Sequence, residues 1–205
     1  MSATRTGLIL VLATALSFAL AGCGPQKPIQ AGGQVQSSGV ALIGGPFQLV
    51  DQDGKAVDQR LLDHKWSAVF FGYTYCPDVC PTTLQTLAQA KAKLGDAAKD
   101  LQVVFISVDP ERDTPAQMKS YLATPAFPHP MLGLTGSPAQ VAAAAKAYRV
   151  YFKKRGEGDS YLMDHSAVIY LMNPDGKFDR VVTESLTPVE IASQIRDAMQ
   201  SGPRT

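Results

Sequence analysis

The fold of this chain is decided by one stretch that joins an apolar run, two cysteines and the start of a helical pattern: Ala68-Val-Phe-Phe-Gly-Tyr-Thr-Tyr-Cys76-Pro-Asp-Val-Cys80-Pro-Thr-Thr-Leu84. The apolar and aromatic residues 68–73 predict a buried strand. Residues 81–94 follow a helical pattern of apolar positions. The two thiols therefore lie where a strand ends and a helix begins, a place where cysteines are often reactive or bind metals.

The chain on either side of this stretch repeats the alternation of apolar runs and helical patterns. Further strands are predicted at residues 103–108, 131–134, 167–172 and 177–182, and further helices at 115–123, 138–148 and 188–200. The turn Asn173-Pro-Asp-Gly176 joins the last two strands into a hairpin. This order predicts an α/β fold with a central mixed sheet flanked by helices and a late β-hairpin. We expect a single such domain over residues 46–201.

Three predicted helices share one start pattern, in which a hydroxyl residue at the N-cap precedes Pro at N1 and Gln or Glu at N3: Thr114-Pro-Ala-Gln117, Ser137-Pro-Ala-Gln140 and Thr187-Pro-Val-Glu190. Each is a capping box. The same alignment of Pro81 places Cys80 at the N-cap of the first helix. A thiol caps less well than a hydroxyl, by about 1 kcal/mol, but a thiolate there would face the positive end of the helix dipole. We therefore predict that Cys80 is reactive or binds a metal, and that its thiol has a lower pKa than that of Cys76.

Three residues separate Cys76 from Cys80. A structural disulfide across so short a loop would restrict the unfolded chain by only about 2 kcal/mol. The dithiol motif of thioredoxins has two intervening residues, and a third loosens the geometry needed for fast exchange. The spacing favours a metal held between two sulfurs, with a third ligand from elsewhere in the chain. A disulfide and dithiol exchange stay as alternatives.

The chain offers three histidines as the third ligand. His64, in a polar turn, and His129, between two prolines, are interpreted as surface residues. His165 lies at the entry to the strand predicted at 167–172, after a polar loop at 153–160, and the residues alone leave it equally open to a structural role. Met163 is a softer candidate that is better explained by packing.

Three motifs occur in order along the chain: Phe71-Gly-Tyr-Thr-Tyr-Cys76 to Leu84, then Ile106-Ser-Val-Asp-Pro-Glu-Arg-Asp-Thr-Pro115, then Asp164-His165 ahead of a strand and an Asn-Pro-Asp-Gly turn. In these motifs the chain closely resembles the Sco/SenC family over about residues 45 to 200. The resemblance implies a thioredoxin-like fold and a copper-binding assembly factor for the binuclear copper centre of cytochrome c oxidase. It matches Cys76 and Cys80 to the family's copper-binding cysteines and His165 to its histidine ligand. The chain departs from the family at Tyr75, where many members have histidine.

The chemistry of these donors agrees with the resemblance. Two thiolates and an imidazole suit Cu(I), and in an oxidising compartment also Cu(II) with a fourth oxygen ligand, while Zn²⁺ suits the same set with water in the open position. Both thiols must be reduced to bind a metal, so we expect a thiol reductant of the thioredoxin-like class as a partner beside the oxidase copper-centre subunit. Two functions stay open. One is a copper chaperone. The other is a thiol–disulfide oxidoreductase, with Cys76 and Cys80 as the redox-active pair, that reduces cysteines of the oxidase copper site or of another exported protein.

The first 45 residues carry targeting information. An uncharged apolar run at residues 7–21 follows Arg5 and predicts a signal peptide over residues 1–22. Leu20-Ala-Gly-Cys23 resembles the lipobox of bacterial lipoproteins, so we expect lipidation of Cys23 and a flexible linker over residues 23–45. An uncleaved transmembrane anchor is the alternative. In either case we expect an exported protein, anchored to the membrane on its periplasmic or extracytoplasmic side.

Composition excludes other classes of function. The 205 residues include 19 Lys and Arg against 18 Asp and Glu, a formal net charge of +1. This balance lacks the basic excess that binding to a phosphate backbone requires, so nucleic acid is not an expected partner. Three cysteines are too few for a disulfide framework.

Overall fold

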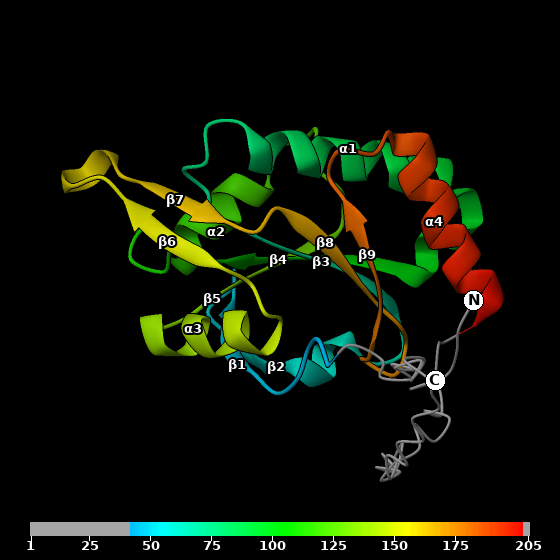
Figure 1. Ribbon diagram of the computed structural model, residues 1–205, viewed down its shortest axis with the longest axis horizontal. Coiled ribbons are helices and arrows are strands. Elements are labelled where there is room, and N and C mark those ends of the chain that lie inside the picture. Colours follow the sequence, from blue (N-terminus) through cyan, green and yellow to red (C-terminus); the bar gives the residue numbers. More distant parts are fainter. Residues whose placement is uncertain (1–41, 203–205) are drawn as a thin grey trace, which may run out of the picture. The chain divides into compact units, whose positions relative to one another are not determined.

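The computed structural model describes residues 42–202. Within them a seven-stranded sheet with strand order β2-β1-β5-β4-β3-β8-β9 has helices on both faces (Figure 1), and β6 and β7 form a separate hairpin. The strands are β1 Gln48–Asp51, β2 Ala56–Asp58, β3 Trp66–Gly72, β4 Leu101–Ser107, β5 Met131–Thr135, β6 Phe152–Arg155, β7 Leu162–His165, β8 Val168–Met172 and β9 Phe178–Thr183. The α-helices are α1 Val79–Lys93, α2 Pro115–Leu122, α3 Pro138–Ala147 and α4 Pro188–Ser201, and short 3-10 helices span Gln59–Leu62, Gly95–Asp100 and Gly158–Ser160.

The centre of the sheet consists of the parallel strands β3, β4 and β5, with Phe70 beside Phe105 and Phe105 beside Gly133. On one side β8 pairs antiparallel with β3 and β9 pairs antiparallel with β8. On the other side β1 pairs antiparallel with β5 and β2 pairs antiparallel with β1. All residues of β3 are buried, as expected for a central strand with helices on both faces. The mixed α/β sheet and its late β8–β9 hairpin confirm the fold class that the sequence predicts.

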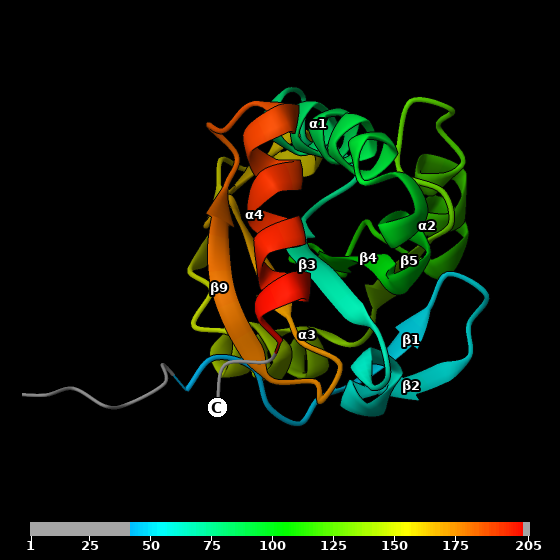
Figure 2. The same ribbon diagram turned by 90° about the vertical axis from the view of Figure 1, so that its right-hand side faces the viewer.

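Helices cover the two faces of the sheet unequally. Helices α1 and α4 lie side by side over one face (Figures 1 and 2), and α2 packs beside β5. Helix α3 lies on the opposite face, where Tyr148 at its end packs against Phe71 with the ring centroids 5.2 Å apart. The parallel strands therefore run between two apolar layers, and the loop after β3 emerges at one end of this body.

The predicted helix starts are confirmed at the three hydroxyl N-caps. Ser137 and Thr187 form complete capping boxes with Gln140 and Glu190. Thr114 accepts a hydrogen bond from the backbone N–H of Gln117, but the Gln117 side chain does not reciprocate and donates instead to Thr74 Oγ1 at 3.2 Å. The capping box predicted at Thr114 is therefore only half formed, because a residue near the cysteines takes the amide.

The predicted N-cap at Cys80 is wrong. Helix α1 begins at Val79, and its N-cap is Asp78, whose side chain makes no capping hydrogen bond. Cys80 is the second residue of the helix and Pro81 the third. The first-turn N–H groups of a helix have no helical acceptor, so a proline is tolerated throughout that turn and does not fix the start to one residue.

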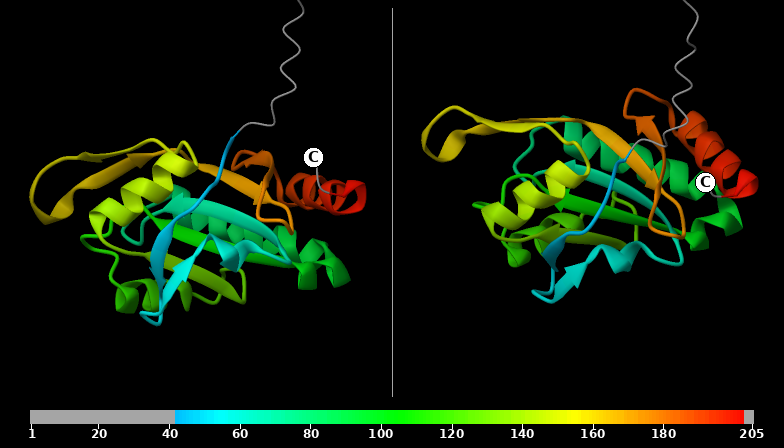
Figure 3. Two further views of the ribbon diagram at one scale, coloured as in Figure 1. Left: turned by 90° about the horizontal axis from the view of Figure 1, so that it is seen from below. Right: turned by 60° about the horizontal axis from the view of Figure 1, so that its bottom comes forward.

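Two strand pairs, β1–β2 and β6–β7, and the short 3-10 helices were not predicted. The predicted polar loop at 153–160 is most of the β6–β7 hairpin, in which Phe152 pairs with His165 and Arg155 with Leu162. The hairpin projects beyond the layered body (Figures 1 and 3). Its strand β6 is mostly exposed and shows no alternation of apolar and polar residues.

The predicted signal peptide, Cys23 and nearly all of the predicted linker lie outside the described residues. At the described end of that linker, the N–H of Gly44 donates to the carbonyl of Ala147 at 3.0 Å, and Arg149 donates to the carbonyl of Leu42 at 3.1 Å. Among residues 42–202, no helix is both long enough and apolar enough to cross a membrane.

Candidate metal centre

The side chains of Cys76, Cys80 and His165 converge. One potential ligand atom from each lies within 4.8 Å of the others, although 85 residues separate Cys80 from His165. Cys76 comes from the loop after β3, Cys80 from the first turn of α1 and His165 from the last position of β7. A shallow pocket of about 270 Å³ opens beside them, lined by Tyr73, Cys76, Pro77, Asp78, Val79, Leu162, Met163, Asp164, His165 and Ala167.

Cys80 lies at the bottom of this group and is fully buried. It sits against β3 at Gly72, where an added Cβ would lie 2.8 Å from the Cys80 Sγ and 2.7 Å from the ring of Phe105. The absence of a side chain at Gly72 therefore gives the thiol its place between α1 and the sheet. The role of Gly72 was not predicted from the sequence, although a glycine near the end of an otherwise apolar strand is typical of a close approach.

Cys76 is half-buried and opens to the pocket. Its Sγ accepts a hydrogen bond from the backbone N–H of Cys80 at 3.4 Å. The pKa of the Cys76 thiol is lowered, first by a hydrogen bond from the Cys80 thiol and then by the His165 ring and by backbone N–H groups at the start of α1, against the effect of burial. The pKa of the Cys80 thiol is raised by the hydrogen bond to Cys76 and by burial. The predicted order of the two pKa values is therefore wrong, because the buried Cys80 thiol donates to Cys76, and the backbone N–H groups at the start of α1 also face Cys76.

The His165 ring is held in one orientation. Its Nε2 lies 3.5 Å from the Cys80 Sγ, and its Nδ1 lies 3.1 Å from the carbonyl oxygen of Ser166. Because a carbonyl only accepts, the Nδ1 N–H donates to it, and Nε2 faces the thiols. The rings of Tyr73 and Phe70 contact it edge-on, with centroids 5.8 and 6.3 Å away. His165 ends a strand of the separate hairpin and lies just before the core strand β8, at whose entry the sequence predicts it.

The other sequence candidates do not belong to this group of ligand atoms. His64 and His129 are exposed surface residues, as predicted. Met163 is half-buried against the core and lines the same pocket as Cys76 and His165, which agrees with the packing interpretation. Cys76 and Cys80 are free thiols.

The donor set fits a soft metal ion. Two sulfurs and an imidazole nitrogen are the ligands that Cu(I) and Zn²⁺ prefer, and among the described residues no carboxylate belongs to this group of ligand atoms. The backbone partner of Nδ1 is the kind of outer contact that orients a metal-binding histidine.

The protein is therefore of the thioredoxin-like class, with a Cys-Cys-His group beside the place where β3 ends and α1 begins. The SCO1/SenC family model matches residues 35–200. The chain therefore belongs to the SCO1/SenC family.

Similar proteins and solved structures also belong to this family. "Protein SCO1 homolog 1, mitochondrial" of Arabidopsis thaliana is 49% identical over 144 residues, which are 69% of this chain and 42% of that protein. The structure of Bradyrhizobium japonicum ScoI with copper bound has 49% identity and a TM-score of 0.69, and the match covers 76% of this chain and 98% of the other. BsSco, a member of the Sco family of cytochrome c oxidase assembly proteins in which a disulfide switch was identified, has 29% identity and a TM-score of 0.60, with 75% and 89% covered. The chain thus spans less than half the length of the Arabidopsis relative.

Proposed function

We propose that this protein is a copper chaperone that binds copper through Cys76, Cys80 and His165 and delivers it to the binuclear copper centre of cytochrome c oxidase during assembly. The observation that carries the proposal is the convergence of two thiols and one imidazole from distant parts of the chain. The copper-bound ScoI structure and the naming of BsSco as an oxidase assembly protein support it.

The different exposure of the ligands suits a cargo that is taken up and handed on. Cys80 is fully buried against the sheet and gives a fixed sulfur, whereas Cys76 opens to the pocket. A thiol of a partner protein can reach a metal at Cys76 first and replace its ligands one at a time. In such an exchange one metal–sulfur bond forms as another breaks, so copper moves without a change of valence.

Copper binding is tested by competition with a Cu(I) chelator under reducing conditions. Cys76→Ser and Cys80→Ser should each weaken binding more than about a hundredfold, beyond the range for loss of an outer-shell partner, and His165→Ala by about tenfold or more. His129→Ala, at an exposed histidine, is the matched control and should bind like wild type. Full affinity in His165→Ala would remove the imidazole from the ligand set.

The second candidate function is a thiol–disulfide oxidoreductase that reduces cysteines of the oxidase copper site or of another exported protein. The polarised pair favours it, because Cys76 has a lowered pKa and Cys80 is a buried thiol beside it. A strain carrying His165→Ala separates the functions. If the protein is a copper chaperone, this strain should lose oxidase assembly because copper binding requires the imidazole. If it is a reductase, the strain should keep oxidase assembly because only the cysteines are needed. Either function requires a thiol reductant, which we propose to be a thioredoxin-like partner.

We further propose that the protein is an exported lipoprotein, cleaved after Gly22 and held to the membrane through Cys23 on the periplasmic or extracytoplasmic side. The lipobox resemblance supports this. A diacylglyceryl group and an N-acyl chain on Cys23 would together supply more than the two hydrophobic signals that stable membrane anchoring needs. Mass spectrometry of the mature amino terminus is the test. A lipidated Cys23 at the first position is expected, and a retained Met1-to-Gly22 segment would replace the lipid anchor with a transmembrane one.

A further inference from the structure

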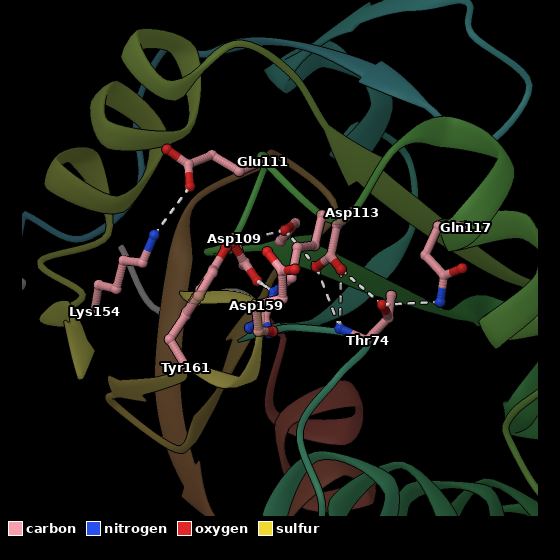
Figure 4. Close-up of polar contacts among 10 residues, drawn as sticks. Thr74, Asp109, Glu111, Asp113, Gln117, Lys154, Asp159 and Tyr161 are labelled. Carbon is pink, nitrogen blue, oxygen red and sulfur yellow. Dashed lines mark hydrogen bonds and ion pairs between the residues drawn. The ribbon is translucent and has the colours of Figure 1, made fainter. Parts of the chain in front are cut away.

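One loop contacts both the segment that leads to Cys76 and the hairpin that carries His165. It runs from Ser107 at the end of β4 to Asp113 before α2, and it contains two acidic side chains that are almost completely buried, Asp109 and Asp113. Figure 4 shows their contacts, which reach Thr74 on one side and Tyr161 on the other. Thr74 lies two residues before Cys76, and Tyr161 directly precedes the strand that ends in His165.

Asp113 holds the segment that leads to Cys76. Its carboxylate accepts hydrogen bonds from the Thr74 hydroxyl at 2.7 Å and from the Thr74 backbone N–H at 3.2 Å. The Ser107 hydroxyl donates to it at 2.6 Å, which ties the carboxylate to β4. The backbone before Cys76 is thus fixed by a side chain from the loop that follows the neighbouring strand β4.

Asp109 holds the hairpin that carries His165. Its Oδ1 accepts a hydrogen bond from the Tyr161 hydroxyl at 2.6 Å, and its Oδ2 pairs with the Arg112 guanidinium at 2.5 Å. Tyr161 is buried, with 5% of its surface exposed. The hairpin pairs with no strand of the seven-stranded sheet, so side-chain contacts of this kind carry much of its attachment.

Arg112 connects the two sides. Its guanidinium stacks 3.6 Å from the centroid of the Tyr161 ring and lies 4.7 Å from that of Tyr75, the residue before Cys76. It also donates to the carbonyl of Asp159 in the hairpin at 3.2 Å. Outside this buried network, the exposed pair of Lys154 and Glu111 adds a weaker contact between hairpin and loop.

We propose that residues 107–113 form a bracket that sets the distance between the imidazole and the thiols, with Asp109 and Asp113 as positioning residues for His165 and Cys76. A buried carboxylate is a poor choice for stability alone, because its desolvation cost offsets what its hydrogen bonds gain. Its directional bonds instead specify one arrangement of the segments that it joins. The proposal rests on the ligand assignment of the proposed function and adds the residues that hold those ligands in place.

Tyr161→Phe tests the histidine side in the metal-free protein. The change removes the hydroxyl that donates to Asp109 and keeps the ring beneath Arg112. Because His165 and Tyr73 rings are in contact, an NMR cross-peak between them should be clear in wild type and weakened in Tyr161→Phe. Tyr151→Phe makes the same chemical change at the start of the hairpin, at a residue that is 59% exposed, and should leave the cross-peak intact. An unchanged cross-peak in Tyr161→Phe overturns the bracket without reference to copper.

A double-mutant cycle with Cu(I) separates positioning from mere stabilisation. Tyr161→Phe should weaken copper binding about tenfold, the lower end for outer-shell partners, and this loss should vanish in the His165→Ala background because no imidazole remains to be positioned. An equal loss in both backgrounds contradicts the proposal. Thr74→Val tests the cysteine side, because it removes the hydroxyl that donates to Asp113 and should weaken copper binding. Thr74→Ser keeps the hydroxyl and should bind copper like wild type. Failure of wild type to bind copper would overturn the proposed function instead, and the cross-peak would still decide the bracket.

Discussion

The two halves of the candidate metal centre are built differently. The cysteines sit on the core, since β3 is wholly buried and Cys80 is packed between α1 and the sheet at Gly72. The histidine sits on a hairpin that projects from the layered body and pairs only with itself. Hydrophobic packing fixes the first half, whereas the second half has only a few apolar contacts with the core, at Phe152 and Met163, and adds hydrogen bonds and aromatic contacts to the 107–113 loop.

This difference gives each half its own response to change. Packing defects near the cysteines should lower the free energy of unfolding and disturb the thiols together, because the same atoms form core and site. Changes in the hairpin contacts should move the imidazole with a smaller effect on global stability, because local segments with few apolar contacts open separately.

The largest expected effect separates the two thiols. Cys76 has a lowered pKa, so it is a thiolate at neutral pH, whereas burial and Cys76 raise the pKa of Cys80 and keep it protonated. In the reduced, metal-free protein, iodoacetamide should modify Cys76 more than about a hundredfold faster than Cys80 at neutral pH, since only the thiolate reacts. The Cys76 rate should stay flat from about pH 6 to about pH 9, the range in which an ordinary thiol becomes ionised. Peptide mapping by mass spectrometry assigns each rate, and equal rates for the two cysteines would refute the polarised pair.

A smaller effect is expected from Gly72→Ala. The added methyl meets Cys80 and Phe105, so unfolding in urea should show a loss of about 1–3 kcal/mol, the usual cost of overpacking. Gly133→Ala is the matched control, because its methyl meets Leu122 and Met118 on α2 instead. Both variants should be destabilised, but only Gly72→Ala should also weaken copper binding and change the Cys76 alkylation rate. An unchanged copper affinity and Cys76 alkylation rate in Gly72→Ala would show that packing at this point of the core does not control the thiols.

The smallest effect is expected at the rim of the hairpin. Glu111 and Lys154 form an ion pair of 3.3 Å in which both side chains are about half exposed or more. Glu111→Gln should change the free energy of unfolding by less than about 0.5 kcal/mol, since solvent screens such pairs, and copper affinity should stay within about twofold, well below the effect of an outer-shell partner. A larger loss of affinity would show that exposed charges, and not the buried bracket, hold the hairpin.

The sequence predicted those parts of the fold whose pattern is local. Thr114, Ser137 and Thr187 mark helix starts because each hydroxyl accepts a hydrogen bond from a first-turn N–H and proline fits the first helical position. The β6–β7 hairpin was not predicted because its strand β6 is exposed and carries Lys153, Lys154 and Arg155 in succession. An exposed strand needs no alternation of apolar and polar residues, so its pattern is the same as that of a polar loop.

The residues of the candidate site could be predicted from the sequence, and the contacts that hold them in place could not. The spacing of Cys76 and Cys80 pointed to a metal, and the family resemblance singled out His165. The contacts of Asp109 with Tyr161 and of Asp113 with Thr74 join residues 52 and 39 positions apart, which no local pattern reports. Both acids do lie in the quoted motif that directly follows a predicted strand, the one place where the sequence offered a hint.

X-ray absorption at the copper edge tests the central claim most directly, because it reports the atoms bound to the metal. In the Cu(I)-loaded, reduced protein we expect two sulfur neighbours and one nitrogen neighbour, and in His165→Ala the same two sulfurs without the nitrogen. Spectra of wild type and His165→Ala that superimpose, or a single sulfur neighbour in wild type, would contradict a site built from Cys76, Cys80 and His165.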